Sequence, residues 1–308
     1  MMEMNRRGFM KRSALLGGAL LVGNQTSKAF GAEGSAAQGD RFAVLTDLTK
    51  CVGCRSCERA CVHVNNLPLP AVGSFADPSV YQKKRWPDAR AYTVVNAYEN
   101  RKWVKPVYRK IQCHHCIEPA CVSACLVGAL KKTPEGAVIY KEELCIGCRY
   151  CMTACPFNIP AFDYHSATRP AIQKCNMCYR RISRGMVPAC VEACPVQANI
   201  FGKRSRLMKL ARERIATDKR YVDHIYGERE AGGTDWLYLS GVPFEAAGFD
   251  MNVEKRPYPE FTKGFLSAVP IVLVTWPVLL GGMAVLARRG KENGADKPAD
   301  QQKEGPKQ

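Results

Sequence analysis

Histidine is scarce in this chain, and several motifs of catalysis are missing from it. The 308 residues include five histidines, and no C-x-x-C pair is followed by histidine, which excludes the commonest attachment motif for covalent haem. The sequence contains no glycine-rich phosphate-binding loop and no recognisable nucleophile motif of Ser, His and Asp. We therefore do not expect the chain to be an enzyme by itself, and we assign no catalytic residue.

Acidic residues are outnumbered by basic ones, 28 against 45, and the formal charge is +17. A charge of this sign often indicates nucleic acid or an anionic membrane surface as the partner. The aromatic residues show no spacing suited to stacking on bases, so we expect no nucleic-acid partner. Part of the positive charge is instead expected to balance anionic metal centres.

Sixteen cysteines form four runs of four, and none is left over. The runs that begin at Cys51 and Cys145 have the spacing C-x2-C-x2-C-x3-C of bacterial ferredoxins, and Pro156 follows the second of them as that pattern expects. The runs that begin at Cys113 and Cys175 widen the second gap to four and eleven residues but keep the final C-x3-C. In this pattern three cysteines of a run bind one 4Fe-4S cluster and the fourth binds another. Runs therefore work in reciprocal pairs.

The segment between Cys125 and Cys145 indicates which runs pair. It contains a turn at Pro134 to Gly136 between β-prone stretches, as in the middle of a ferredoxin. We therefore pair the second run with the third, which leaves the first with the fourth. All sixteen cysteines are then iron ligands of four 4Fe-4S clusters, in the sets Cys113, Cys116, Cys121 with Cys155; Cys145, Cys148, Cys151 with Cys125; Cys51, Cys54, Cys57 with Cys194; and Cys175, Cys178, Cys190 with Cys61.

Zinc and histidine ligation are the alternatives to this assignment. Structural zinc also uses C-x2-C pairs. A zinc site takes two such cysteine pairs, which would not produce runs of three closely spaced cysteines followed by a fourth. His114 and His115 are expected to be spacers, because every cubane corner already has a thiolate. Cations near the runs are either a solvated basic face or groups that favour the reduced clusters; they are Lys50, Arg55, Arg149, Lys174, Arg180 and Arg181.

Residues 1 to 32 resemble a twin-arginine export signal. Arg6 and Arg7 stand in a basic stretch, an apolar run follows from Ala14 to Val22, and small residues lie near Ala29 and Ala32. About ten apolar residues are too few to span ~30 Å of hydrocarbon, which argues against a membrane anchor at this end. We expect Arg6 and Arg7 to direct export of the folded protein, and the cleavage site stays open between Ala29 and Ala32.

The remaining pattern predicts an α+β fold of two ferredoxin-like units with two clusters each, a hairpin insert and a C-terminal transmembrane helix. The body is expected at 33–262, with an inner unit at about 105–165 and an outer unit that joins about 40–62 to 166–204. The hairpin lies between Val62 and Gln112, a basic amphipathic helix at Leu207 to Ile215, and a strand between Gly232 and Glu245. Trp86, Trp103 and Trp236 are candidates either for partner contact or for the core.

The C-terminal region contains 24 residues without a charge, Gly264 to Ala287, closed by Arg288 and Arg289. This length suffices for a helix that crosses the bilayer once, so we predict a transmembrane helix at 263–288 and a disordered tail at 289–308. The export signal places the body on the periplasmic side of the inner (cytoplasmic) membrane, and the basic residues after the span agree with that orientation.

Taken together, these features resemble the four-cluster iron–sulfur subunits that accompany molybdopterin oxidoreductases and membrane hydrogenases. The leader, four full cysteine runs, GGT before an apolar strand, GVPFE and a C-terminal anchor are most similar to the hydrogenase-2 type of electron-transfer subunit. The resemblance implies a relay of single electrons between the small subunit of a periplasmic nickel–iron hydrogenase and an integral membrane subunit that handles quinone. Leu126 departs from the pattern of this family, in which proline usually follows the last cysteine of the second run, here Cys125.

Two alternatives to a relay for a hydrogenase remain open. The same relay could serve another redox subunit, of a molybdopterin-type reductase or a formate dehydrogenase. A member of another class, a structural scaffold that holds clusters or zinc, would show no reversible reduction by a physiological donor.

Overall fold

The computed structural model describes residues 40–69, 75–101, 103–165 and 171–295. The expected export signal, with Arg6 and Arg7, lies outside the described residues. A three-stranded sheet has the strand order β8-β1-β9, with β1 (Phe42–Asp47) in the centre. It pairs antiparallel with β8 (Asn199–Lys203) and parallel with β9 (Trp236–Leu239). The pairing with β8 brings the segment before the first cysteine run beside the segment after the fourth.

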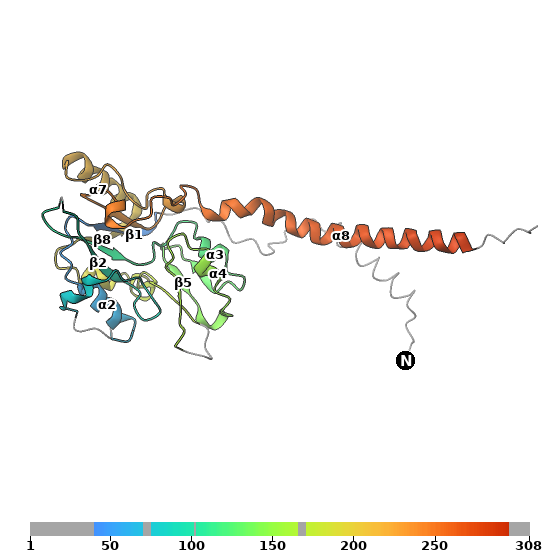
Figure 1. The fold of residues 1–308 in the computed structure, drawn as a ribbon, viewed down its shortest axis with the longest axis horizontal. Coiled ribbons are helices and arrows are strands. Elements are labelled where there is room, and N and C mark those ends of the chain that lie inside the picture. Colours follow the sequence, from blue (N-terminus) through green and yellow to red (C-terminus); the bar gives the residue numbers. More distant parts are fainter. Residues whose placement is uncertain (1–39, 70–74, 102, 166–170, 296–308) are drawn as a thin grey trace, which may run out of the picture. The chain divides into compact units, whose positions relative to one another are not determined.

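Side chains alternate between the two faces of this sheet, as the pleat requires. Ala43 and Leu45 of β1 face α7 (Arg204–Thr217), which buries Leu207, Met208 and Ala211 against them. Figure 1 shows α7 beside β1 and β8. The amphipathic helix expected at Leu207 to Ile215 is confirmed, and it extends a few residues further at both ends. The opposite face carries Val44, Trp236 and Tyr238 into a second core, which also contains several of the cysteines.

Short elements frame the cysteine runs. In the first run α2 (Ser56–Val64) packs against α6 (Ala189–Glu192) of the fourth. In the middle of the chain α3 (Ala120–Ser123) lies beside α4 (Tyr150–Thr153) (Figure 1). The fourth run also contains α5 (Tyr179–Ile182). Single-turn 3-10 helices occur at Pro78–Gln82, Glu142–Leu144, Glu230–Gly232 and Glu245–Ala247.

Three two-stranded antiparallel ribbons complete the body. The expected hairpin insert is confirmed as β2 (Val94–Tyr98) paired with β3 (Val107–Ile111). The turn at Pro134 to Gly136 joins β4 (Leu130–Lys132) to β5 (Val138–Tyr140), as its sequence predicts. The third ribbon pairs β6 (Ala161–Phe162) with β7 (Ile172–Gln173). The expected mixture of helices and strands is therefore correct.

The tryptophan side chains differ in exposure. Trp236 is fully buried and belongs to the core. Trp86 is 46% exposed and donates a hydrogen bond to the carbonyl of Asn158. Of the candidates for partner contact, Trp86 therefore keeps that possibility and Trp236 does not.

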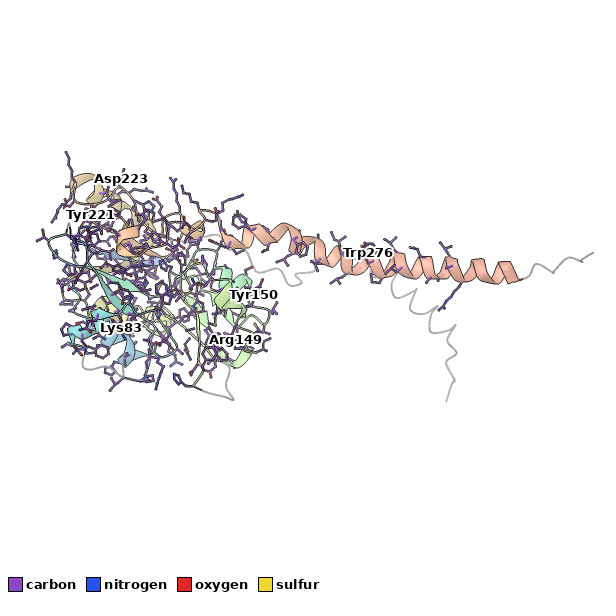
Figure 2. The ribbon with its side chains drawn as sticks, viewed as in Figure 1. Lys83, Arg149, Tyr150, Tyr221, Asp223 and Trp276 are labelled. Atoms are coloured by element: carbon purple, nitrogen blue, oxygen red, sulfur yellow. The ribbon has the colours of Figure 1, made fainter. Side chains whose placement is uncertain are left out.

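The long C-terminal helix α8 (Tyr258–Ala295) contains Pro270 and Pro277. Its stretch from Tyr258 to Arg288 is long and apolar enough to cross a membrane, with a mean hydropathy of 2.2 over its most apolar window. Trp276 lies on it, 55% exposed (Figure 2). The candidate span begins five residues before the expected start at 263 and ends at Arg288 as expected, while the helix itself continues through 289–295, where the start of a tail was expected.

Candidate metal centres

The cysteine runs repeat one backbone geometry. Gly53 and Gly147 stand at matching places in the first and third runs with φ of 72° and 71°, and Arg55 and Arg149, two residues further on, have φ of 57° and 61°. In the second and fourth runs His115 and Met177 are left-handed as well, with φ of 51° and 55°. Left-handed residues turn the chain tightly, so that successive cysteines and amide groups can face one enclosed space.

Backbone amides donate to the cysteine sulfurs in an equally regular way. The first cysteine of three runs accepts an N–H from two residues ahead: Cys113 from His115 at 3.5 Å, Cys145 from Gly147 at 3.4 Å, and Cys175 from Met177 at 3.4 Å. The last cysteine of two runs accepts from four residues ahead, at 3.2 Å in both Cys125 and Cys194. Such donors favour anionic sulfur, which is the form that binds iron.

Two cavities of the body are each lined by four cysteines. The first quartet, Cys51, Cys54, Cys57 and Cys194, lines one cavity together with Thr46, Asn199 and Lys110. The second quartet, Cys61, Cys175, Cys178 and Cys190, lines the other, where Lys110 appears again beside Trp236. The structure thus brings together cysteines of the first and fourth runs that lie far apart in sequence.

The other cysteines also act on one another in the expected groups. Burial first, and then Cys155, Cys113 and Cys121, raise the pKa of Cys116 well above its usual range. We call these four cysteines the third quartet. Burial, followed by Cys125, Cys145 and Cys148, raises the pKa of Cys151 to about 11. These four form the fourth quartet.

Interactions between quartets give their order. Burial and then Cys190 of the second quartet raise the pKa of Cys57 in the first, while Lys110 lowers it. Burial raises the pKa of Cys175 to about 12, with contributions from Cys190 and from Cys113 of the third quartet. Cys151 of the fourth quartet raises the pKa of Cys121 in the third, after burial and the thiols of its own quartet. Cysteines of the first three quartets also share one buried core, and those of the third and fourth share another, so the quartets follow one another from first to fourth.

The two ends of this series reach the surface. Cys54 of the first quartet and Cys148 of the fourth are exposed. Exposed apolar side chains are adjacent in sequence to cysteines of the fourth quartet: Leu126 is 76%, Ile146 60% and Tyr150 52% exposed. Arg149 and Tyr150 lie next to each other at the start of α4 (Figure 2). Leu126, which stands where proline is usual, is one of these exposed residues.

These residues fit 4Fe-4S clusters. Burial makes the thiols costly to ionise on their own, and iron removes that cost because it binds the deprotonated sulfur. Each quartet would hold one cluster by four thiolates, and the amide donors would stabilise its negative charge. No group of three His, Cys, Asp or Glu side chains within the described ranges is arranged around a single metal ion.

The two histidines of the second run are part of the packing. His114 stacks on Phe157 with 4.0 Å between ring centroids, and Nδ1 of His115 accepts the N–H of Val138 at 2.9 Å. Burial, reinforced by Arg109 and Lys110, lowers the pKa of His114 to about 3. Both rings are buried and neutral, so they surround the ligands without carrying charge.

The cations near the runs differ in exposure. Arg55 and Lys174 are buried, whereas Lys50, Arg149 and Arg180 are exposed. Arg181 is half-buried and pairs with Glu192 at 2.6 Å. Sequence reasoning missed Lys110 and Gln112, which are buried beside the cavities. The sequence shows that both residues stand just before Cys113, but it does not show that the fold brings Lys110 of β3 to the first and second quartets.

Comparisons with known proteins agree with this site. The family model of the 4Fe-4S dicluster domain matches residues 104–204. A protein of Nitratidesulfovibrio vulgaris is 47% identical over 96% of this chain and 80% of its own length. The hydrogenase-2 operon protein HybA of Escherichia coli O157:H7 is 34% identical over 94% of this chain and 97% of its own length. The iron–sulfur subunit of the nitrate-inducible formate dehydrogenase of Escherichia coli K12 is 34% identical over 64% of this chain and 67% of its own.

Proposed function

Since this chain belongs to the family of the hydrogenase-2 operon protein HybA, as an iron–sulfur electron-transfer subunit, we propose that it relays single electrons through four 4Fe-4S clusters. The expected resemblance to hydrogenase-2 type subunits is thereby confirmed. All sixteen cysteines would be the iron ligands, in the four quartets described above. Each cluster supplies a one-electron couple when bound.

The single observation that carries this proposal is the order of the quartets. Cysteines of the first, second and third quartets share one buried core, and Cys121 of the third shares another with Cys151 of the fourth, so each quartet adjoins the next. Three of the four cysteines are buried in each of the second and third quartets, whereas the first and fourth quartets expose one cysteine each. An electron can therefore enter at one surface and leave at another.

The partners follow from the relatives and from α8. The donor would be the small subunit of a periplasmic nickel–iron hydrogenase, and the acceptor an integral membrane subunit that handles quinone. The span Tyr258–Arg288 would cross the inner membrane once, with the body on the periplasmic side after twin-arginine export. The hydrogen bonds of Ala231 N–H to Glu254 and of Gly232 N–H to Lys255 would hold the start of this span to the body.

A second candidate donor is a formate dehydrogenase or molybdopterin-type reductase. It is favoured by the 34% identity to formate dehydrogenase iron–sulfur subunits. The two candidates differ in how much of the chain they explain, because these relatives cover 64% and 73% of it, whereas HybA covers 94%. This difference favours the hydrogenase.

The test is purification of the chain in mild detergent from its own membranes, followed by identification of its companions. We expect a hydrogenase small subunit and a membrane subunit, and we expect hydrogen to reduce the clusters reversibly. Formate-dependent reduction together with a molybdenum subunit would select the second candidate. Clusters that no donor reduces, or zinc in their place, would indicate a structural scaffold instead.

A further inference from the structure

Lys110 of β3 is buried between the first and second quartets. Its side chain lines both cysteine-lined cavities, and the residue is only 2% exposed. Cys57 lines the first of these cavities with it, and Cys175 and Cys190 line the second. Two of these belong to the second quartet and one to the first, so the ammonium group faces both.

Neutral partners hold the lysine in this place. Nζ donates a hydrogen bond to Oε1 of Gln112 at 2.9 Å and lies 4.3 Å from the ring centroid of Trp236. Gln112 is fixed in turn, because its amide nitrogen donates to the hydroxyl of Tyr238 at 2.6 Å. That hydroxyl donates to the carbonyl of Lys110 at 3.1 Å. The amide and the rings orient the ammonium group but do not neutralise it.

A buried ammonium group needs an anionic partner, since desolvation of an uncompensated charge is strongly unfavourable. Among the described residues, no carboxylate forms an ion pair with its Nζ, and apart from the neutral Gln112 and Trp236 the cavities that it lines contain the cysteines of both quartets. The counter-charge therefore comes from the two quartets and whatever they bind.

We propose that Lys110 is a shared cation that raises the reduction potentials of the clusters in the first and second quartets together. The inference rests on the proposed function and deepens it. Each added electron makes a cluster more negative, so a nearby fixed cation favours the reduced state of both. Because one cation serves both centres, it shifts their potentials in the same direction and adds no step between them. Lys110 thus acts on the clusters through its positive charge and does not bind iron.

The experiment is an anaerobic redox titration of the intact complex, followed by electron paramagnetic resonance. In the Lys110→Gln variant we expect two of the four cluster potentials to fall and the other two to stay unchanged. At a fixed solution potential, the ratio of reduced to oxidised cluster should fall about tenfold at both centres, which corresponds to about 59 mV for a one-electron couple. Iron content, measured alongside, should equal that of the unaltered protein.

Two controls separate charge from other effects. Lys209→Gln removes the same charge from α7, where the side chain is 80% exposed, and should move no potential. Lys110→Arg keeps the charge and should leave both potentials closer to the unaltered values than Lys110→Gln does. Unchanged potentials in Lys110→Gln, or equal shifts in all four centres, would overturn the proposal.

A second variant covers the case in which Lys110→Gln does not load its clusters. Gln112→Glu places an anion beside Nζ without a change of volume, and should lower the same two potentials. Failure of both variants to load clusters would reduce Lys110 to a structural residue and also overturn the proposal. Failure of the proposed function looks different, because the unaltered protein would then show no cluster signals at all.

Discussion

Arg55 and Arg149 have the same left-handed backbone conformation, with φ of 57° and 61°, but their side chains lie in opposite environments. The guanidinium of Arg55 is buried and pairs with Glu58 at 2.9 Å. Arg149 is exposed and lies over the ring of Phe162, 5.2 Å from its centroid. The side chains at equivalent positions of two cysteine runs therefore make different contacts, a buried ion pair at Arg55 and an exposed cation–π contact at Arg149.

This difference predicts unequal costs of substitution. Arg55→Ala should lower the free energy of unfolding by about 2 kcal/mol more than Arg149→Ala, because it leaves the buried Glu58 with only part of its charge compensation. Arg85 still pairs with Glu58 at 2.6 Å, which limits the loss. Both variants put alanine at a left-handed position, so that cost cancels. Anaerobic thermal unfolding of the cluster-loaded proteins measures the difference, and equal unfolding temperatures would contradict it.

The quartets predict which cysteines share a cluster. Cys54→Ala and Cys194→Ala should remove the same paramagnetic signal, although the two residues belong to different runs. Cys178→Ala should remove a different one. If each run instead held its own cluster, Cys194→Ala would match Cys178→Ala, and the pairing of the first run with the fourth would be wrong.

Much of the local structure could be predicted from the sequence, because turns and alternation are local signals. The hairpin at 94–111, the turn at Pro134 to Gly136 and the helix around Leu207 all follow from such signals. The sheet that pairs Val44 with both Phe201 and Trp236 does not, because no local pattern fixes a register between strands so far apart.

Lys110 shows the same limit at the site. A lysine in a hairpin strand is ordinarily a solvated residue, and its neighbours in sequence gave no sign of burial. Only the three-dimensional fold places Lys110 in the lining of both cysteine-lined cavities. The continuation of α8 to Ala295 was missed for a different reason: its last residues are polar, and a polar sequence after a span is typical of both helix and tail.

Export is predicted to depend on the paired arginines of the leader. Replacing Arg6 and Arg7 together by lysine should leave cluster-loaded protein in the cytoplasm, because the change keeps the charge but removes the twin-arginine motif. Lys11→Arg is a matched control that should export normally. Cell fractionation with iron analysis measures the outcome, and periplasmic, cluster-loaded protein from the double variant would show that another signal directs export.

One face of α8 is predicted to pack on the membrane partner. In alternating steps of four and three, Pro270, Val274, Pro277, Gly281 and Ala284 share that face, and small residues allow close approach of a second helix. A Cβ atom placed at Gly281 meets no atom within 4 Å outside the adjoining helix backbone, so packing within the described chain does not require glycine here.

Gly281→Leu combined with Ala284→Leu should therefore leave insertion and the clusters intact, yet loosen the partner and slow electron flow from donor to quinone severalfold. Val272→Leu with Met283→Leu, on the other side of the helix, should change neither. Co-purification and quinone reduction measure both effects. Full retention of both in the first variant would mean that α8 is a simple anchor.

All sixteen cysteines are proposed to hold iron in four quartets. Anaerobic purification followed by determination of iron and acid-labile sulfide tests it most directly. We expect about sixteen iron and about sixteen sulfide per chain, since each 4Fe-4S cluster takes four thiolates. About eight of each would mean that only two quartets are loaded, and stoichiometric zinc without sulfide would contradict the account altogether.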